Sequence, residues 1–391
     1  MKNKFQDYPL LKISRKQKSV PLFYPHIPKN AKKIMSKILS TRWIGQGPLV
    51  DKFEKVFSKK FCNKHSTIAV GSGTDALHLA YLLSDLKEDD EVICPVFTCT
   101  ATNIPLLYIR SKIKFADIDP DTFNVSLDSI KKLITKKTKA IVFVNYGGLL
   151  CDLDGLNKLV KNKNIVLIQD AAQSLGAKYK NKSICDYADF TIFSFQAIKH
   201  ITSGDGGALC IRDKKLVNKA KRIRWFGINR ERKQNGTWEN DIKEIGYKYQ
   251  MTDLGAGLLL ESIKEFKKIR KIRNEIYKTY LKYIKFDKKI SCLKNKDKKA
   301  SPVIWLFTII SPYKNIIQKE LRKYKIETNQ VHFRNDKYSI FKSFSKKSKF
   351  RNMDKLEEQY LVLPVHTKMS AKDAKNISFK INEILRKNKN I

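Results

Sequence analysis

A lysine that precedes a glycine-rich turn is the feature of this sequence best suited to covalent chemistry. Lys199 ends the run Ser194-Phe-Gln-Ala-Ile-Lys, and the turn Ser203-Gly-Asp-Gly-Gly207 follows shortly after it. A lysine amine can bind the aldehyde of pyridoxal phosphate as a Schiff base, and once released it can act as the general base that moves a proton between carbons. The glycines let the backbone approach closely or take positive φ. This segment therefore predicts a pyridoxal phosphate site with Lys199 as its catalytic residue.

Two apolar runs end in polar residues that could complete this site. Residues 165–168 lead to Asp170 and then to Gln173, whereas residues 190–193 lead to Ser194. We expect both runs to be strands of a parallel sheet, because open α/β sheets bind their ligands at the carboxyl ends of such strands. A carboxylate there can keep the pyridine nitrogen protonated, which makes the ring an electron sink.

The phosphate of such a cofactor needs a cradle of its own. Residues 67–70 form a strand-like run, and Gly71-Ser-Gly73-Thr74-Asp75 then leads into an amphipathic helical pattern. Backbone amides at the start of a helix bind phosphate, and the Thr74 hydroxyl can add a hydrogen bond. The strand before this turn and the helix after it are what make it a candidate phosphate site.

Helical patterns and short apolar runs alternate along the chain, which favours an α/β fold with a mainly parallel sheet and helices on both faces. A long helical pattern over residues 254–284 leads to a smaller α+β domain. We expect a basic N-terminal extension (1–25), a large cofactor-binding domain with an N-terminal helix (26–265) and a small C-terminal domain (266–391). Helices are expected over residues 31–39, 50–57, 76–83, 127–134 and 153–160, and strands over 67–70, 91–94, 114–116, 140–144 and 208–211 as well as before Asp170 and Ser194.

The composition fits an ordinary globular enzyme. With 391 residues, of which 42% are hydrophobic, the chain can form two or three domains with a normal core. The net charge of +41 invites a nucleic-acid or anionic-membrane hypothesis, but the lysines are spread over the whole chain and no DNA- or RNA-binding motif accompanies them. We therefore expect no specific nucleic acid partner. We also expect no membrane insertion, because no run of about 18 apolar residues is present.

The seven cysteines are scattered, odd in number and without metal-ligand spacing. They predict reduced thiols, with neither a disulfide framework nor a metal site. Residues 1–20 are basic and lack the apolar region and cleavage site of a secretory signal, so we expect a cytoplasmic protein. The cysteines are Cys62, Cys94, Cys99, Cys151, Cys185, Cys210 and Cys292.

Taken together, the order of these motifs resembles that of the DegT/StrS family of nucleotide-sugar aminotransferases, from about Pro21 to near the C-terminus. The resemblance implies a fold-type I homodimer with shared active sites and pyridoxal 5'-phosphate as cofactor. It further implies transfer of an amino group from an amino-acid donor, L-glutamate, to a 3-keto or 4-keto nucleotide-linked sugar for cell-surface glycan or polysaccharide synthesis. The motifs are Gly71-Ser-Gly-Thr-Asp-Ala-Leu77, Asp170-Ala-Ala-Gln173, the Ser194 to Gly207 segment and Gly246-Tyr-Lys-Tyr-Gln-Met-Thr-Asp253, with Gly45 to Glu54 near the start.

The same resemblance implies a role for each matching residue. Lys199 would be the Schiff-base lysine and Asp170 the partner of the pyridine nitrogen, while Gln173 would lie against the ring near its oxygen. The phosphate-binding residues would be Gly73, Thr74, Asp75 through its amide, Ser194 and, from the partner subunit, Lys248.

Several positions depart from the family pattern. Cys99 stands where the family often stacks an aromatic residue on the cofactor ring, so we do not expect it to stack. Lys248 replaces an Asn that reaches the phosphate of the partner subunit; it could make that contact as a point charge or be a solvated loop lysine. Gln196 and His200 replace the residues that usually flank the lysine motif. His332 is a candidate substrate contact in a segment that predicts a distinct sugar pocket.

Two other functions use the same fold. A noncatalytic relative would act as a binding or regulatory protein, with its lysines attracted to an anionic polymer. A sugar dehydratase of this family would have histidine in place of the Schiff-base lysine, and His200 directly follows Lys199. The spacing from Ser194 favours Lys199, and its combination with Asp170 favours the aminotransferase.

Overall fold

A seven-stranded sheet forms the centre of the computed structural model, which describes residues 19–237, 241–295, 297–345 and 349–387. All neighbouring strands are parallel except β9, which is antiparallel to both β1 and β8. The strands are rich in apolar residues and buried on both faces, as expected for a sheet covered by helices on both sides. In spatial order they are β1 (Ser66–Val70), β9 (Gly207–Ile211), β8 (Phe190–Ser194), β5 (Val166–Asp170), β4 (Thr138–Val144), β2 (Glu91–Pro95) and β3 (Lys112–Ala116).

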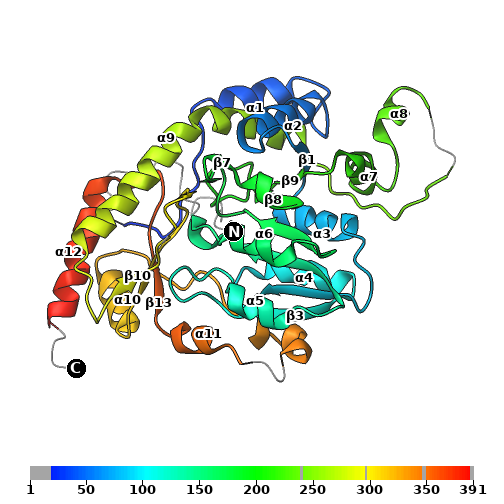
Figure 1. The fold of residues 1–391 in the computed structure, drawn as a ribbon. Helices are drawn as coiled ribbons and strands as arrows, with labels where there is room; N and C mark the ends of the chain where they lie inside the picture. The colour runs from blue at the N-terminus through cyan, green and yellow to red at the C-terminus, as the bar shows by residue number, and fades with distance from the viewer. Residues whose placement is uncertain (1–18, 238–240, 296, 346–348, 388–391) are drawn as a thin grey trace, which may run out of the picture.

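Helices cover both faces of this sheet (Figure 1). One face packs against α3 (Gly73–Leu83), α4 (Thr100–Tyr108) and α7 (Val217–Ile223). The other face packs against α2 (Pro48–Phe61), α5 (Leu127–Leu133), α6 (Leu153–Val160) and the first half of the long helix α9 (Asp253–Tyr283). Helix α1 (Ala31–Leu39) lies against α9.

The C-terminal part is a smaller α+β unit. Strand β12 (Phe307–Ile310) pairs antiparallel with β10 (Ser291–Cys292) and β13 (Tyr360–Leu363). The second half of α9 packs against α12 (Ala371–Lys387) and so joins the two parts (Figure 1). The boundary expected at residue 265 falls inside α9. The remaining helices here are α10 (Lys314–Lys323) and α11 (Arg351–Leu356), with 3-10 turns η5 (Asn335–Lys337) and η6 (Ser339–Phe344).

Short elements complete the described fold. Figure 1 shows α8 (Arg230–Gln234) on an arm that extends away from the body. A minor sheet contains β11 (Ala300–Ser301), β6 (Lys178–Tyr179) and β7 (Lys182–Ser183), and further 3-10 turns are η2 (Tyr146–Gly148), η3 (Ile184–Tyr187) and η4 (Lys214–Leu216).

The predicted α/β architecture is confirmed, with differences at particular elements. The helices expected over 31–39 and 153–160 are present with those bounds, whereas α2 extends beyond the expected 50–57 at both ends, and a distant residue caps its start. The Asp253 carboxylate accepts hydrogen bonds from the amides of Gly47 at 2.8 Å, Leu49 at 3.1 Å and Val50 at 3.0 Å. These contacts stabilise the start of α2 and join the two motifs that contain Gly45 and Asp253.

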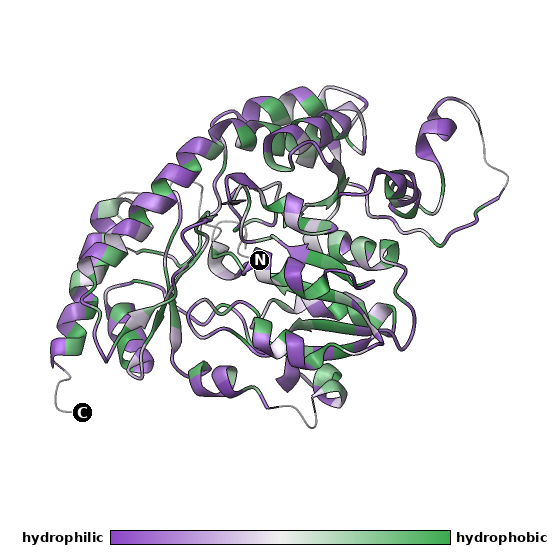
Figure 2. Cartoon of the chain, in the orientation of Figure 1, coloured by the Kyte–Doolittle hydropathy of each residue, from purple (hydrophilic) through white to green (hydrophobic). Residues whose placement is uncertain are grey.

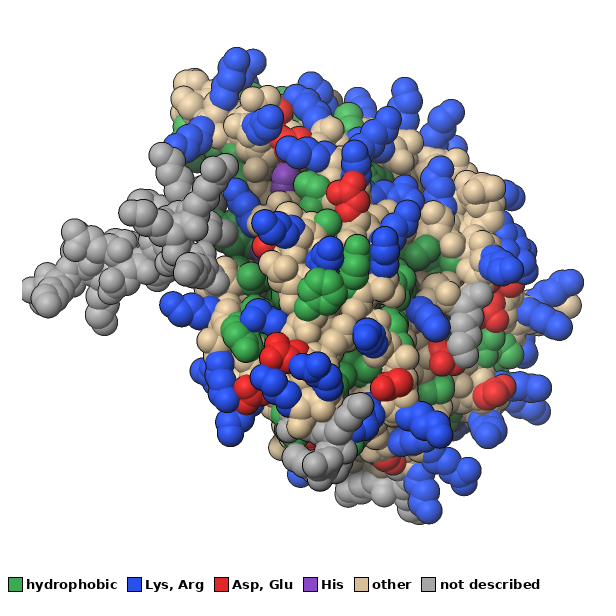
Figure 3. Space-filling model, turned by 90° about the vertical axis from the view of Figure 1, so that its left-hand side faces the viewer, with side chains coloured by type: hydrophobic (Ala, Val, Ile, Leu, Met, Phe, Trp, Pro, Cys, Tyr) green, Lys and Arg blue, Asp and Glu red, His purple; other side chains and the backbone are tan. Residues whose placement is uncertain are grey.

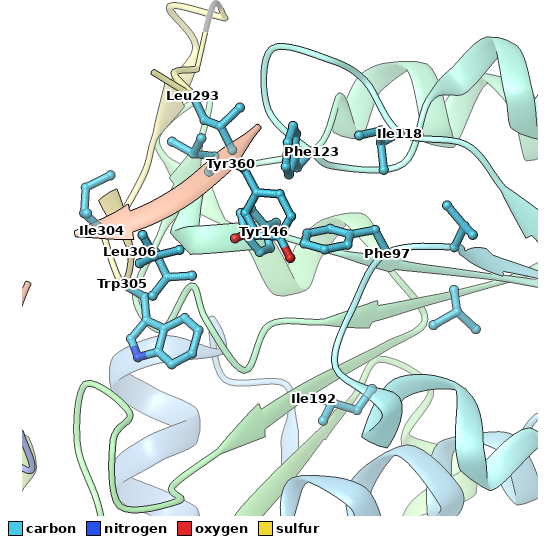
Figure 4. Close-up of a cluster of buried hydrophobic side chains, with 14 of the residues drawn as sticks. Phe97, Ile118, Phe123, Tyr146, Ile192, Leu293, Ile304, Trp305, Leu306 and Tyr360 are labelled. Atoms are coloured by element: carbon cyan, nitrogen blue, oxygen red, sulfur yellow. The ribbon is translucent and has the colours of Figure 1, made fainter. Parts of the chain in front are cut away.

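Aromatic packing holds the C-terminal unit against the large sheet. Figure 4 shows Phe97, Tyr146 and Tyr360 pointing toward one another; the ring of Phe97 lies 5.2 Å from that of Tyr146 and 5.3 Å from that of Tyr360. Because Tyr360 belongs to β13 and the other two belong to the large domain, this cluster fixes the relative position of both parts.

The segment around Leu22 is part of the fold. The Leu22 amide donates to the Glu327 carboxylate at 3.1 Å, and His366 donates to the Pro21 carbonyl at 2.9 Å. The expected N-terminal extension (1–25) is therefore packed against the C-terminal unit from Val20 onward, while residues 1–18 lie outside the described residues.

The polar surface and the apolar interior separate as expected. In Figure 2 the helices present hydrophilic residues outward and the central strands are hydrophobic. Lys and Arg side chains are distributed over the face seen in Figure 3, with a few acidic residues among them. None of the described helices has the length and apolar character needed to cross a bilayer.

Candidate active site

A cavity of about 470 Å³ lies where the carboxyl ends of β5 and β8 meet the start of α3. The C-terminal unit closes one side through Trp305 and His332, and Phe23 contributes from the N-terminal segment. The residues expected from sequence that line this cavity are Gly73, Thr74, Cys99, Asp170, Gln173, Ser194, Lys199 and His332.

The start of α3 forms an anion cradle. Ser72 caps the helix by accepting a hydrogen bond from the Asp75 amide at 3.0 Å, and the amides of the first turn have no acceptor within the helix. Gly73 allows this turn to approach β8, because a Cβ at Gly73 would lie 2.9 Å from the Cβ of Ser194. Similarly, a Cβ at Gly207 would lie 2.2 Å from the Ser72 carbonyl oxygen. The cradle therefore depends on close packing of backbone that only glycine permits.

Lys199 lines the cavity and packs against Trp305. Its Nζ lies 4.0 Å from the centroid of the Trp305 ring, and the Trp305 indole donates to the Ile198 carbonyl at 2.9 Å. Burial lowers the pKa of Lys199, while Cys99 and Asp170 act in the opposite direction. A lowered pKa increases the fraction of neutral amine, which is the form that attacks an aldehyde or accepts a proton.

Asp170 is 5% exposed at the end of β5. Its carboxylate accepts hydrogen bonds from the Thr102 hydroxyl at 2.8 Å and from the Ala172 amide at 3.0 Å. Burial raises the pKa of Asp170, and these two hydrogen bonds together with Lys199 limit that rise. A buried carboxylate held in this way is suited to pair with a cationic ring nitrogen.

Gln173 and His332 form a hydrogen-bonded pair in the wall of the cavity. The Gln173 Oε1 accepts from the Gly147 amide at 2.7 Å, so its Nε2 donates to His332 Nε2 at 3.1 Å. This places the imidazole proton on Nδ1 of His332. Burial lowers the pKa of His332 to about 3, and the ring is therefore neutral at physiological pH.

His200 points away from the cavity. It is 1% exposed, and its Nε2 donates to the Ile304 carbonyl at 3.1 Å. Lys199 lines the cavity and His200 does not, which argues against histidine as the reactive residue at this turn.

Two residues of the expected site are not among those that line this cavity. The Asp75 amide is used in the cap of α3, and burial raises the pKa of its carboxyl group. Lys248 is exposed and lies beside Trp225, with which it forms an isolated β-bridge. Within one protomer, Lys248 is therefore not among the residues that surround Lys199.

Sequence reasoning missed several residues of this site. Trp305 and Phe23 line it from segments distant from the motifs, whereas Thr102, which donates to Asp170, lies three residues after Cys99. Thr102 lies in the first turn of α4, directly after the segment that follows β2, and this position could have suggested it. Trp305 carries no local signal, because a single tryptophan in an apolar run is typical of a core.

The residues present fit pyridoxal 5'-phosphate. A partly buried amine, a buried carboxylate and a helix start close to a serine hydroxyl surround one cavity, which matches the aldehyde, the ring nitrogen and the phosphate of that cofactor. The start of α3 lies so close to Ser194 that a Cβ at Gly73 would be 2.9 Å from the Ser194 Cβ, which brings the helix amides and the serine hydroxyl to one end of the cavity.

Comparison with known proteins agrees with this chemistry. The model of the DegT/DnrJ/EryC1/StrS aminotransferase family matches residues 25–382. A UDP-4-amino-4,6-dideoxy-N-acetyl-beta-L-altrosamine transaminase of Campylobacter jejuni is 31% identical over 90% of this chain and 94% of its own. A GDP-perosamine synthase of Escherichia coli is 34% identical over 63% of this chain and 66% of its own. The PLP-form structure of Spr1654 from Streptococcus pneumoniae superposes with a TM-score of 0.85 at 25% identity, covering 94% of this chain and 99% of that one.

Proposed function

This chain belongs to the DegT/DnrJ/EryC1/StrS aminotransferase family, and we propose that it transfers an amino group from L-glutamate to a 3-keto or 4-keto nucleotide-linked sugar. The cofactor of the family is pyridoxal 5'-phosphate. The observation that carries the proposal is the cavity in which Lys199, Asp170 and the start of α3 face one another.

Each part of the cavity has a chemical task. When bound, pyridoxal phosphate supplies an electron-withdrawing ring and carries the amino group between the two halves of the reaction. Lys199 Nζ attaches the cofactor and then moves a proton at the substrate carbon, a task helped by its lowered pKa. Asp170 provides the negative charge for the ring nitrogen, with Thr102 fixing its orientation at 2.8 Å. The first-turn amides of α3 and the Ser194 hydroxyl bind the phosphate.

The substrate class is inferred from the relatives and from the composition of the cavity wall. The names of the two curated relatives refer to a UDP-linked and a GDP-linked sugar, so a nucleoside diphosphate sugar is the shared chemistry. Asn329, Gln330 and the neutral His332 line the same cavity and offer polar groups to a sugar. We place the product in glycan or polysaccharide synthesis. We place the enzyme in the cytoplasm because its seven cysteines are all free thiols.

The projecting arm supports the proposal of a homodimer with shared active sites. Ile245 is 83% exposed, Ile242 54% and Phe226 43%, and all three lie on the chain around α8 that extends from the body (Figure 1). Exposed apolar residues grouped on such an arm favour burial against a second copy. The exposed Lys248 comes directly after this arm, from which its ammonium could reach the phosphate of the partner subunit's cofactor.

The shared site is tested with a mixed dimer. One chain carries Lys199→Ala and the other Lys248→Ala, so a shared geometry leaves one intact site and one doubly damaged site. We expect about half of the activity of the unmodified dimer at limiting cofactor, which is more than either parent homodimer retains. The matched control places both substitutions in one chain beside an unmodified partner, which damages each site once. Activity of the first mixed dimer no higher than that of the parents would refute the shared geometry.

The reaction is tested by incubating the purified protein with glutamate and a panel of 3-keto and 4-keto nucleotide sugars. We expect an amino sugar as product, identified by mass spectrometry and NMR, with Lys199→Ala as the inactive control. A dehydrated sugar without nitrogen would instead identify a dehydratase. Failure to bind the cofactor together with no product would identify a noncatalytic relative.

A further inference from the structure

Three buried cysteines converge in a part of the molecule that the reaction does not use. Cys62 directly follows α2, Cys185 lies in η3 and Cys210 lies in β9, and they are 0%, 1% and 2% exposed. Their Sγ atoms all lie within 4.8 Å of one another. None of the three is among the residues that line the active-site cavity. The sequence does not reveal this cluster, because its members are far apart along the chain.

Strand pairing places two threonines beside one cysteine of this cluster. Cys210 lies opposite Thr67 of β1 on one side and opposite Thr191 of β8 on the other. Side chains directly opposite in antiparallel strands share a face, so the two threonines flank the cysteine. The Thr67 hydroxyl is buried and has no hydrogen-bond partner. An unpaired buried hydroxyl beside three thiols is a donor available to a negatively charged sulfur.

Hydrogen bonds hold the segment around Cys185 against the end of α2. The Ser183 hydroxyl donates to the Phe61 carbonyl at 2.6 Å and accepts from the Cys185 amide at 3.2 Å. This links η3 to the end of α2, which carries Cys62. The positions of the sulfur atoms are therefore set by the backbone of three separate elements, as in a preformed site.

The sulfur spacing suits one soft cation. With metal–sulfur distances of about 2.3 Å, three thiolates around a single ion lie about 3.8–4.0 Å apart. In this structure the Sγ–Sγ distances are at most 4.8 Å, which is close to this value. Small side-chain rotations would therefore bring all three sulfurs into coordination. Thiolates select soft closed-shell ions over Mg²⁺ or Ca²⁺.

We propose that Cys62, Cys185 and Cys210 bind one soft d¹⁰ cation, Zn²⁺ or Cu⁺, and thereby tie the end of α2 to η3 and β9. Each cysteine binds as a thiolate, so its proton is released to solvent on binding and no electron is transferred. The Thr67 hydroxyl then donates to the negatively charged sulfur cluster. The site is structural and distinct from the cavity around Lys199.

The test uses the full-length protein loaded with its cofactor. Metal-free protein is titrated with Zn²⁺ against a chromophoric chelator and, separately under argon, with Cu⁺ against bicinchoninate. We expect one ion per chain in at least one of the two titrations. Thermal unfolding of the unmodified chain should shift upward with added ion, because an ion that binds only the folded state stabilises it.

Variants localise the binding. Cys210→Ala should weaken ion affinity by at least 100-fold, whereas the matched control Cys94→Ala, a fully buried cysteine on strand β2 of the same sheet, should leave it unchanged. Equal ion affinity in both variants would show that the three thiols only pack as small apolar groups. The same conclusion would follow if the unmodified chain showed neither stoichiometric binding nor a thermal shift. A disulfide between any two of them in the purified protein would also overturn the proposal.

Discussion

Substituting Gly73 by alanine tests whether close packing at the start of α3 forms the cofactor cradle. The added Cβ would lie 2.9 Å from the Cβ and 3.3 Å from the Oγ of Ser194. Ordinary van der Waals contact begins at 3.4 Å, so α3 and the end of β8 must separate by about 0.5 Å. Forced repacking of this kind costs about 1–3 kcal/mol.

The free-energy cost of this repacking should appear as weaker binding of the cofactor. The helix start and Ser194 can separate without the cofactor, but both must approach the same phosphate when it binds. A cost of about 1–3 kcal/mol corresponds to cofactor affinity roughly 5- to 150-fold weaker. Without the cofactor, relaxation of the helix start and the better helix propensity of alanine should offset part of this cost, so the loss in free energy of unfolding should stay below about 3 kcal/mol.

The assay is titration of the cofactor-free enzyme with pyridoxal phosphate, followed by absorbance, with thermal unfolding as the measure of fold. Gly45→Ala is the matched control, since a Cβ at Gly45 meets no atom within 4 Å. Cofactor affinity within twofold of the unmodified enzyme in Gly73→Ala would refute the cradle.

Three further predictions concern charge and burial. Asp170→Asn should preserve the fold but remove most turnover, because the ring nitrogen loses its anionic partner; near-normal turnover would assign the carboxylate another role. If Lys248 makes a charge-assisted hydrogen bond to the phosphate, Lys248→Ala should weaken cofactor binding by about 1–3 kcal/mol. Unchanged cofactor affinity would show that Lys248 is a solvated surface lysine. Burial lowers the pKa of His366 to about 4, below its unfolded value of 6.5. The unfolded chain therefore binds more protons between these values, and the free energy of unfolding should fall by up to about 3 kcal/mol as the pH drops from 6.5 to 4. Urea unfolding at pH 7 and pH 5 measures this loss, which should be smaller in His366→Asn.

The parts of the fold and site that follow from sequence are those encoded in continuous segments. Asp170, Ser194 and Lys199 each lie at or just beyond the end of an apolar strand, and the parallel arrangement brings such ends to one edge of the sheet. Gly73 is predictable in the cradle because a glycine-containing turn joins a strand to a helix. The convergence of these residues therefore follows from their strand-end positions in a mainly parallel sheet.

Residues brought in from distant segments could not be predicted in this way. Trp305 reaches Lys199 from the C-terminal unit, and Phe23 reaches the same cavity from a segment whose composition indicates only a basic extension. The antiparallel direction of β9 depends on how the chain returns after Lys199, which hydrophobic periodicity does not encode. Likewise, the clustering of Cys210 with two other cysteines follows from this pairing and not from their spacing.

Borohydride reduction of the cofactor-loaded enzyme tests the role of Lys199 most directly. The purified protein should be yellow, lose this absorption on reduction with labelled borohydride, and yield the label on the peptide that contains Lys199. The Lys199→Ala variant should yield no labelled peptide. Recovery of the label on a different lysine of the unmodified chain would contradict the assignment of the active site.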